Sequence, residues 1–174
     1  MSLKGLLDRF RVEMTGRNWG VPCDFLHYML GDFEQSHAIS LLHDVLVRSW
    51  LEKSELTLGI WKLADDFGRR QARFLPYWNN KEFVKIETEN CYASLYHHPE
   101  NGVLMIISNL GEAKAKGNVS LILSKFTLLP NKINVIDGLS RIEIFTKTSL
   151  KQKFLIVQGE CGKIIGVVWR NYVL

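Results

Sequence analysis

The fold is decided by residues 65–80, DDFGRRQARFLPYWNN, because the pattern of apolar residues changes across this stretch. Before it, apolar residues recur at helical spacing, and after it they alternate or form short runs. Gly68 can adopt the left-handed conformation that ends a helix. Pro76 cannot continue a helix and favours an extended conformation at Leu75. The stretch therefore predicts a junction between a helical part and a β part.

The two parts are predicted to be joined by an aromatic group made of Phe74, Tyr77 and Trp78, which we call the clasp. Large aromatic side chains dominate buried contact area, so these rings are expected to bury against one or both parts. The predicted division is a helical segment, residues 1–80, followed by a β part, residues 81–174. The fold class is therefore α+β.

Three helices are predicted in the helical segment. The first begins near Ser2 and ends at Gly16, the second opens at a capping box of Asp32 and Gln35, and Ser54 caps the third. Their apolar faces are Leu3, Leu6, Leu7, Phe10 and Met14 in the first helix, Ala38, Ile39, Leu41, Leu42, Val45 and Leu46 in the second, and Leu56, Ile60, Leu63 and Phe67 in the third.

The β part reads as an antiparallel sandwich of seven or eight short strands. Asn101-Gly102 and Asp137-Gly138 stand between apolar runs and predict two hairpin turns. The run 103–110 is apolar on both sides, which indicates a central strand. The expected strands are Phe83–Ile86, Cys91–His97, Val103–Leu110, Asn118–Leu123, Ile133–Gly138, Ile142–Phe145, Phe154–Val157 and Ile164–Trp169.

Composition narrows the classes of partner. The chain has 174 residues, a formal net charge of +4 and no recognised nucleic-acid motif, so no nucleic-acid partner is expected. No apolar run approaches the roughly 20 residues that span a membrane, so no membrane partner is expected either. The compartment is unknown, and an extracellular location requires a signal peptide on a longer parent chain. The three cysteines, Cys23, Cys91 and Cys161, form no CxxC pair, so no zinc site of that type is expected. The sequence also has no phosphate-binding Gly-rich loop and no helical zinc motif, and no metal or cofactor is expected.

His43 and Asp44 are the first candidate site residues. Adjacent residues do not share a face of a helix or strand, so the pair can form a site only in a loop or at a strand end. Residues 43–48 could continue the second helix or form a short buried strand, because periodicity alone does not separate the two. Trp19 lies in a predicted loop and could stack on a sugar ring, whereas Trp61 lies on an apolar helix face and is expected to pack in the core.

Two other pairs favour structural roles. His97-His98 precedes a predicted hairpin turn, and no third metal ligand is placed near it. Asp65 and Asp66 are adjacent, so they cannot flank a glycosidic bond in the way that paired catalytic carboxylates do.

Several stretches together carry a resemblance to a known family. They are Arg17-Asn18-Trp19-Gly20 with Pro22, residues 41–48 (LLHDVLVR), Phe67-Gly68 with residues 74–80 (FLPYWNN), and residues 103–111 (VLMIISNLG). The chain resembles the C-terminal portion of glycoside-hydrolase-like proteins that are relatives of the bacterial N-acetyl-galactosaminidase family.

The resemblance implies that residues 1–80 are the end of a (β/α)8 barrel and that an accessory β-sandwich follows. It places the catalytic acids upstream, so no catalytic residue is expected in this chain. Trp19, His43, Asp44 and Arg48 match positions near the end of the barrel and are expected to line a pocket. The implied partners are the remainder of the parent barrel and glycans. An isolated barrel end would also expose apolar helix faces.

Two alternatives remain at this point. The chain could be a free-standing carbohydrate- or protein-binding sandwich module with a helical prefix. It could also be a self-contained hydrolase that uses His43 and Asp44.

Overall fold

The computed structural model describes residues 7–14, 33–48, 54–126, 133–147, 155–161 and 164–171. Its helices are α1 (Leu7–Met14), α2 (Phe33–Leu41) and α3 (Ser54–Phe67), with 3-10 turns at Arg69–Gln71, Tyr77–Asn79 and Leu123–Lys125. Its strands are β1 (Arg73–Leu75), β2 (Val84–Ile86), β3 (Cys91–His98), β4 (Gly102–Asn109), β5 (Ala115–Leu121), β6 (Ile133–Asp137), β7 (Glu143–Lys147), β8 (Leu155–Cys161) and β9 (Ile164–Asn171). No helix in these ranges is long and apolar enough to cross a membrane.

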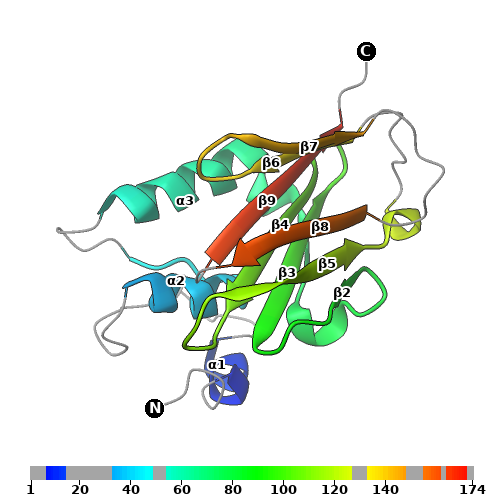
Figure 1. Cartoon of the computed structure of the whole chain (residues 1–174). Coiled ribbons are helices and arrows are strands. Elements are labelled where there is room, and N and C mark those ends of the chain that lie inside the picture. Colours follow the sequence, from blue (N-terminus) through cyan, green and yellow to red (C-terminus); the bar gives the residue numbers. More distant parts are fainter. Residues whose placement is uncertain are drawn as a thin grey trace.

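The strands form two antiparallel sheets. One sheet has six strands in the order β1-β3-β4-β9-β6-β7, and the other has three strands in the order β2-β5-β8 (Figure 1). Strand β4 lies inside the larger sheet between β3 and β9, and all its residues are buried, as its apolar sequence predicted. The last two strands, β8 and β9, are neighbours in sequence but lie in different sheets.

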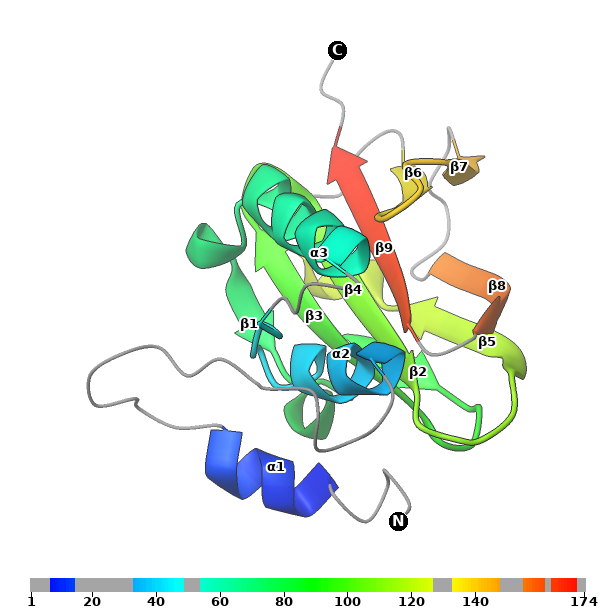
Figure 2. The same cartoon turned by 90° about the vertical axis from the view of Figure 1, so that its left-hand side faces the viewer.

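The larger sheet has a core on each face. Side chains on one face, including Leu95 and Met105, share a buried cluster with Val119 and Leu121 of the smaller sheet. Side chains on the other face, including Leu104, pack against α2 and α3. Figure 2 shows these two helices in front of the larger sheet. The helices, the six-stranded sheet and the three-stranded sheet are therefore stacked in that order.

The junction has the predicted helix end and ring contacts, and its three clasp rings are half-buried. Helix α3 ends at Phe67, and Gly68 has φ +76° in the left-handed region. Phe74 packs on Tyr96 of the larger sheet, with ring centroids 5.0 Å apart. Tyr77 contacts Tyr92 of the same sheet at 5.4 Å. The clasp therefore holds the junction on the sheet.

Both predicted hairpins are present. Residues 99–101 join the paired His98 and Gly102, and Gly102 has φ +86°. Strands β6 and β7 pair across the turn that starts at Asp137-Gly138. Side chains of β3 alternate between the two faces of the larger sheet, because Tyr96 faces the helices while Leu95 faces the smaller sheet.

The second helix is shorter than its apolar run suggested. It ends at Leu41, and residues 42–44 form a turn. The strand alternative for residues 43–48 is met only by an isolated bridge at Val47. Predictions that concern Ser2, Gly16, Trp19, Cys23 and Asp32 lie outside the described residues.

The α+β class with antiparallel sheets is confirmed. The barrel end, the sandwich and the division at residue 80 stay predictions. Among the described residues, the exposed large apolar side chains are Val12 and Leu58 on helices, and Leu139 and Ile142 near the β6–β7 turn.

Candidate functional site

The turn after α2 presents the first two candidate residues. The amide of Val45 donates to the carbonyl of Ser40 at 3.1 Å, and the amide of Asp44 donates to the carbonyl of Leu41 at 3.4 Å. Asp44 itself has φ +63°. This is the Schellman arrangement that ends many helices, with aspartate at the left-handed position where glycine is usual. The turn directs Asp44 and His43 to different neighbours.

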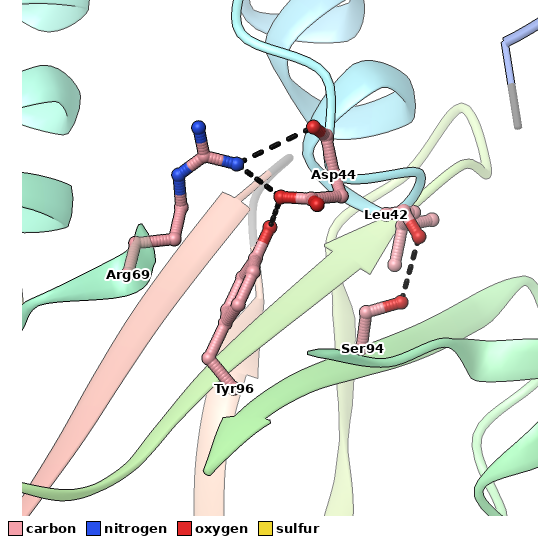
Figure 3. Close-up of polar contacts among 5 residues, drawn as sticks. All are labelled: Leu42, Asp44, Arg69, Ser94 and Tyr96. Carbon is pink, nitrogen blue, oxygen red and sulfur yellow. Dashed lines mark hydrogen bonds and ion pairs between the residues drawn. The ribbon is translucent and has the colours of Figure 1, made fainter. Parts of the chain in front are cut away.

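Asp44 binds two side chains from the β part. Its Oδ1 accepts a hydrogen bond from the Tyr96 hydroxyl at 2.8 Å and forms an ion pair with Nη1 of Arg69 (Figure 3). Arg69 also donates to the Asp44 carbonyl at 3.4 Å. The Arg69 guanidinium carbon lies 6.0 Å from the centroid of the Tyr96 ring. We call Asp44, Arg69 and Tyr96 the polar triad.

The electrostatics of the triad keep Tyr96 and Arg69 protonated, which is the form in which each binds Asp44. Burial raises the pKa of Tyr96 well above its usual value, and the negative charge of Asp44 raises it further. The Tyr96 hydroxyl therefore stays a hydrogen-bond donor. Burial alone would lower the pKa of Arg69, but the interactions with Tyr96 and Asp44 outweigh it and raise that pKa. The ion pair therefore persists over the whole range in which the carboxylate is ionised.

The His43 side chain is only 2% exposed and lies among aromatic rings. Its Nδ1 lies 2.7 Å from the carbonyl of Ile39, which requires a proton on Nδ1. Its Nε2 can then accept from the Tyr77 hydroxyl at 3.5 Å. The His43 ring lies 5.4 Å from the ring of Tyr77 and 5.6 Å from that of Trp78. His43 is thus part of the contact between α2 and the clasp.

Helix α1 also contacts these aromatic residues. Phe10 lies 6.0 Å from the His43 ring, and the guanidinium of Arg11 lies 5.2 Å from the Trp78 ring in cation–π geometry. Burial raises the pKa of Tyr77 to about 12, and the charge of Asp8 contributes to the rise. Tyr77 is therefore a protonated packing residue at physiological pH rather than a candidate base.

Of the four predicted site residues, the structure describes His43, Asp44 and Arg48. His43 and Asp44 share a turn but serve different contacts, as their adjacency suggested. Arg48 is exposed, and no hydrogen bond or ion pair joins it to the other described residues. Trp19 lies outside the described residues. The pocket expected from these residues therefore stays a prediction.

Arg69 and Tyr96 are the partners that sequence reasoning missed. A signal for Tyr96 was present, because the strand alternation already placed this polar-tipped side chain on the same face as Ser94. For Arg69 the signal was weak, because it stands in a dense basic group with Arg70 and Arg73.

The remaining candidates have structural contacts. Nδ1 of His98 accepts hydrogen bonds from the amides of Glu100 and Asn101, at 3.1 and 3.0 Å, and so shapes the β3–β4 turn. Asp66 is paired with Arg141 and Lys62 on the surface, and its hydrogen bond to Arg141 is the main cause of its lowered pKa. No group of three or more potential metal ligands occurs within the described ranges.

Trp61 has its predicted packing role in part. The side chain is half-buried and packs against the cluster between the helices and the larger sheet. Its indole N–H is buried and has no hydrogen-bond partner among the residues that the structure describes.

The family follows from a comparison with known proteins. A family model for "Glycoside hydrolase 123, C-terminal domain" matches residues 57–165. The chain belongs to this family. The resemblance to relatives of the N-acetylgalactosaminidase family is thereby confirmed. The match begins inside α3 and ends in β9, so it includes Arg69 and Tyr96 but excludes Asp44. No curated protein and no solved structure matches the chain.

A pH dependence is expected from His43. Burial lowers its pKa from 6.5, while hydrogen bonds to the backbone of Ile39 and Leu7 oppose that shift in part. The unfolded chain therefore takes up this proton at higher pH than the folded chain does. The contribution of neutral His43 to the free energy of unfolding is fully present above pH 6.5. The free energy of unfolding should therefore fall as the pH drops below that value.

Urea unfolding at pH 7.5 and at pH 5.5 measures this effect. The substitution His43→Gln should reduce the difference between the free energies of unfolding at the two pH values. His97 also has a lowered pKa, caused first by burial and then by the charge of Arg73, so it acts in the same direction. His97→Gln is therefore the matched control and should remove a separate, additive part. An unchanged pH difference in His43→Gln would show that another group is responsible.

Proposed function

We propose that this chain is the non-catalytic C-terminal part of a glycoside-hydrolase-like protein and packs as an accessory domain on the catalytic barrel of its parent. The observation that carries the proposal is the set of contacts made by the Asp44 carboxylate. Its carboxylate is held by Arg69 and Tyr96, and the triad contains no second carboxylate. Glycoside hydrolysis ordinarily needs two facing carboxyl groups, one of them free to exchange a proton. An aspartate in these contacts suits a structural joint better than an acid or base.

The finer architecture is part of the proposal. The two sheets form an accessory β-sandwich, and a shared buried cluster between their facing sides supports this. Residues 1–80 include the end of a (β/α)8 barrel. The order of α2, a short segment with a β-bridge at Val47, and α3 supports that reading, because barrels repeat helix, strand and helix. Exposed Val12 and Leu58 agree with helix faces that a larger body covers.

The partners follow from the same proposal. The first is the remainder of the parent barrel, and the second is a glycan bound near Trp19, His43, Asp44 and Arg48. The upstream reading frame should accordingly continue into a barrel that carries paired acidic residues. The rival function is a free-standing module that binds carbohydrate or protein.

The test is an assay of the purified chain with an aryl N-acetylgalactosaminide. We expect no turnover above the buffer rate, in the unmutated chain and in Asp44→Asn alike. Turnover that Asp44→Asn abolishes, while circular dichroism shows the fold intact, would overturn the non-catalytic role. Saturable binding on a glycan array by the chain, unaffected by the presence of a separately produced parent barrel, would favour the free-standing module instead.

A further inference from the structure

Three hydroxyl groups line the face of the larger sheet that receives α2. They belong to Ser94 and Tyr96 on β3 and to Ser108 on β4, which we call the hydroxyl strip. All three side chains are almost completely buried, at 0%, 2% and 0% exposed. A buried hydroxyl without an acceptor is costly, so this face requires a partner that supplies acceptors.

Each hydroxyl finds its acceptor in one short segment upstream. Ser94 donates to the carbonyl of Leu42 at 2.7 Å (Figure 3), and Ser108 donates to the carbonyl of Ala38 at 2.8 Å. Tyr96 donates to the carboxylate of Asp44 at 2.8 Å. The two carbonyls lie four residues apart, one helical turn, and the left-handed turn places the carboxylate beyond them. The three hydroxyl donors of the strip are therefore spaced to meet the acceptors at the end of a helix and on the left-handed aspartate that follows it.

The donors and acceptors fall on opposite sides of the family boundary. The hydroxyl strip lies within the matched residues 57–165, whereas residues 38–44 lie outside them. A fourth contact crosses the same boundary, because Nε2 of His37 lies 3.1 Å from Oγ1 of Thr57, the first matched residue. The sheet and α3 therefore make buried hydrogen bonds with a segment that lies outside the matched residues.

The upstream segment is also buried too thoroughly to be a loose attachment. Helix α2 is enclosed along most of its length, and its buried residues are Phe33, Ser36, His37, Ala38, Ile39, Ser40 and Leu41. Its apolar members join two clusters, one with Leu7 and Phe10 of α1 and one with Leu104 of the sheet. Helix α2 therefore lies inside the core rather than on its surface.

We propose that residues 33–48 form one cooperative core with the C-terminal domain, so that this segment is fixed rigidly on the six-stranded sheet. The hydroxyl strip sets the position of this segment, and the polar triad locks its end. The identity of the segment as part of a barrel rests on the proposed function, but the rigid attachment does not. The domain is then a rigid support for residues 33–48, and α2 and the sheet open as one unit.

Native-state hydrogen exchange of the full chain in low urea tests the proposal. Amides of α2 and of β4 should open together, with protection factors within about tenfold of each other. Ser94→Ala and Ser108→Ala should lower the protection of both elements by the same factor. Ser124→Ala, which removes an exposed hydroxyl in a 3-10 turn, is the matched control and should change neither element.

The opposite pattern would overturn the proposal. If α2 exchanges about 100-fold faster than β4, or if the serine variants accelerate α2 alone, the segment is a separable arm. Should a variant fail to fold, the comparison of α2 with β4 in the unmutated chain decides the question alone. Glycosidase activity in the chain would contradict the proposed function but would not affect the conclusion that α2 and β4 open together. Independent opening of α2 would contradict the rigid attachment only.

Discussion

Leu104→Ala is expected to lower the free energy of unfolding by about 2–5 kcal/mol, as large-to-small changes in well-packed cores do. Leu104 is 2% exposed and lies on β4, within the larger sheet. It belongs to the cluster that includes Leu41 of α2 and Phe67 of α3. Two helices and a sheet meet at this side chain, so the surroundings can collapse little into the space that the substitution leaves.

Urea unfolding followed by circular dichroism measures the decrease in the free energy of unfolding. Two further variants serve as comparisons. Leu58→Ala removes a leucine that is 53% exposed on α3 and should change the stability by less than about 0.5 kcal/mol. Met105→Ala removes the next side chain of β4, which faces the smaller sheet and is also 2% exposed. It should cost about as much as Leu104→Ala. If Leu104→Ala costs less than about 1 kcal/mol, the helices do not form a tight core with the sheet.

The parts of the fold that sequence could predict are those set by local chemistry. Gly68 ends α3 because glycine enters the left-handed region at little cost, and that property is visible in the sequence. The β3–β4 hairpin follows from Asn101-Gly102, and the β6–β7 hairpin from Asp137-Gly138, between apolar runs. These features depend on a few adjacent residues, so a single sequence is sufficient to find them.

The parts that sequence could not predict depend on distant pairings. Strands β8 and β9 have similar apolar runs, yet one pairs with β5 and the other with β4 and β6. Strand β1 is only three residues long and lies within the predicted junction, so no periodicity marks it. The partner of each strand is decided by the whole arrangement of the sheets, which local patterns do not encode.

The candidate site shows the same division. That His43 and Asp44 diverge follows from their adjacency alone. The partners of Asp44 are 25 and 52 residues away, at Arg69 and Tyr96. The end of α2 was also misplaced, because Asp44 occupies a left-handed position for which glycine is the usual sequence signal. The long-range contacts of Asp44 stabilise a left-handed conformation that the local sequence does not predict.

Gly117→Ala is expected to destabilise the chain by about 1–3 kcal/mol, the range for overpacking in a well-packed region. A Cβ at this position of β5 would lie 1.7 Å from Oγ1 of Thr88 and 3.0 Å from its Cβ. Rotation of the threonine side chain can move the oxygen but leaves its Cβ in place. The backbone of the turn before β3 must therefore shift, or β5 must bend away from it.

The sign of this effect is what makes the experiment informative. Glycine in a strand or helix interior ordinarily costs about 0.5–1 kcal/mol relative to alanine, so alanine would otherwise be favourable. Gly59 of α3 provides the matched control, because its added Cβ would meet only Leu139 Cδ2 at an ordinary 3.8 Å. Gly59→Ala should therefore stabilise the chain by about 0.5–1 kcal/mol.

A second substitution tests whether Thr88 is the cause. In the Thr88→Gly background the Cβ and Oγ1 atoms that obstruct residue 117 are gone, so Gly117→Ala should become neutral or slightly stabilising. Thermal and urea unfolding of the four variants gives the coupling energy between the two positions. A coupling near zero would mean that the turn and β5 do not approach as closely as the structure shows. A coupling of about 1–3 kcal/mol would establish that residue 117 is glycine because of space rather than backbone conformation.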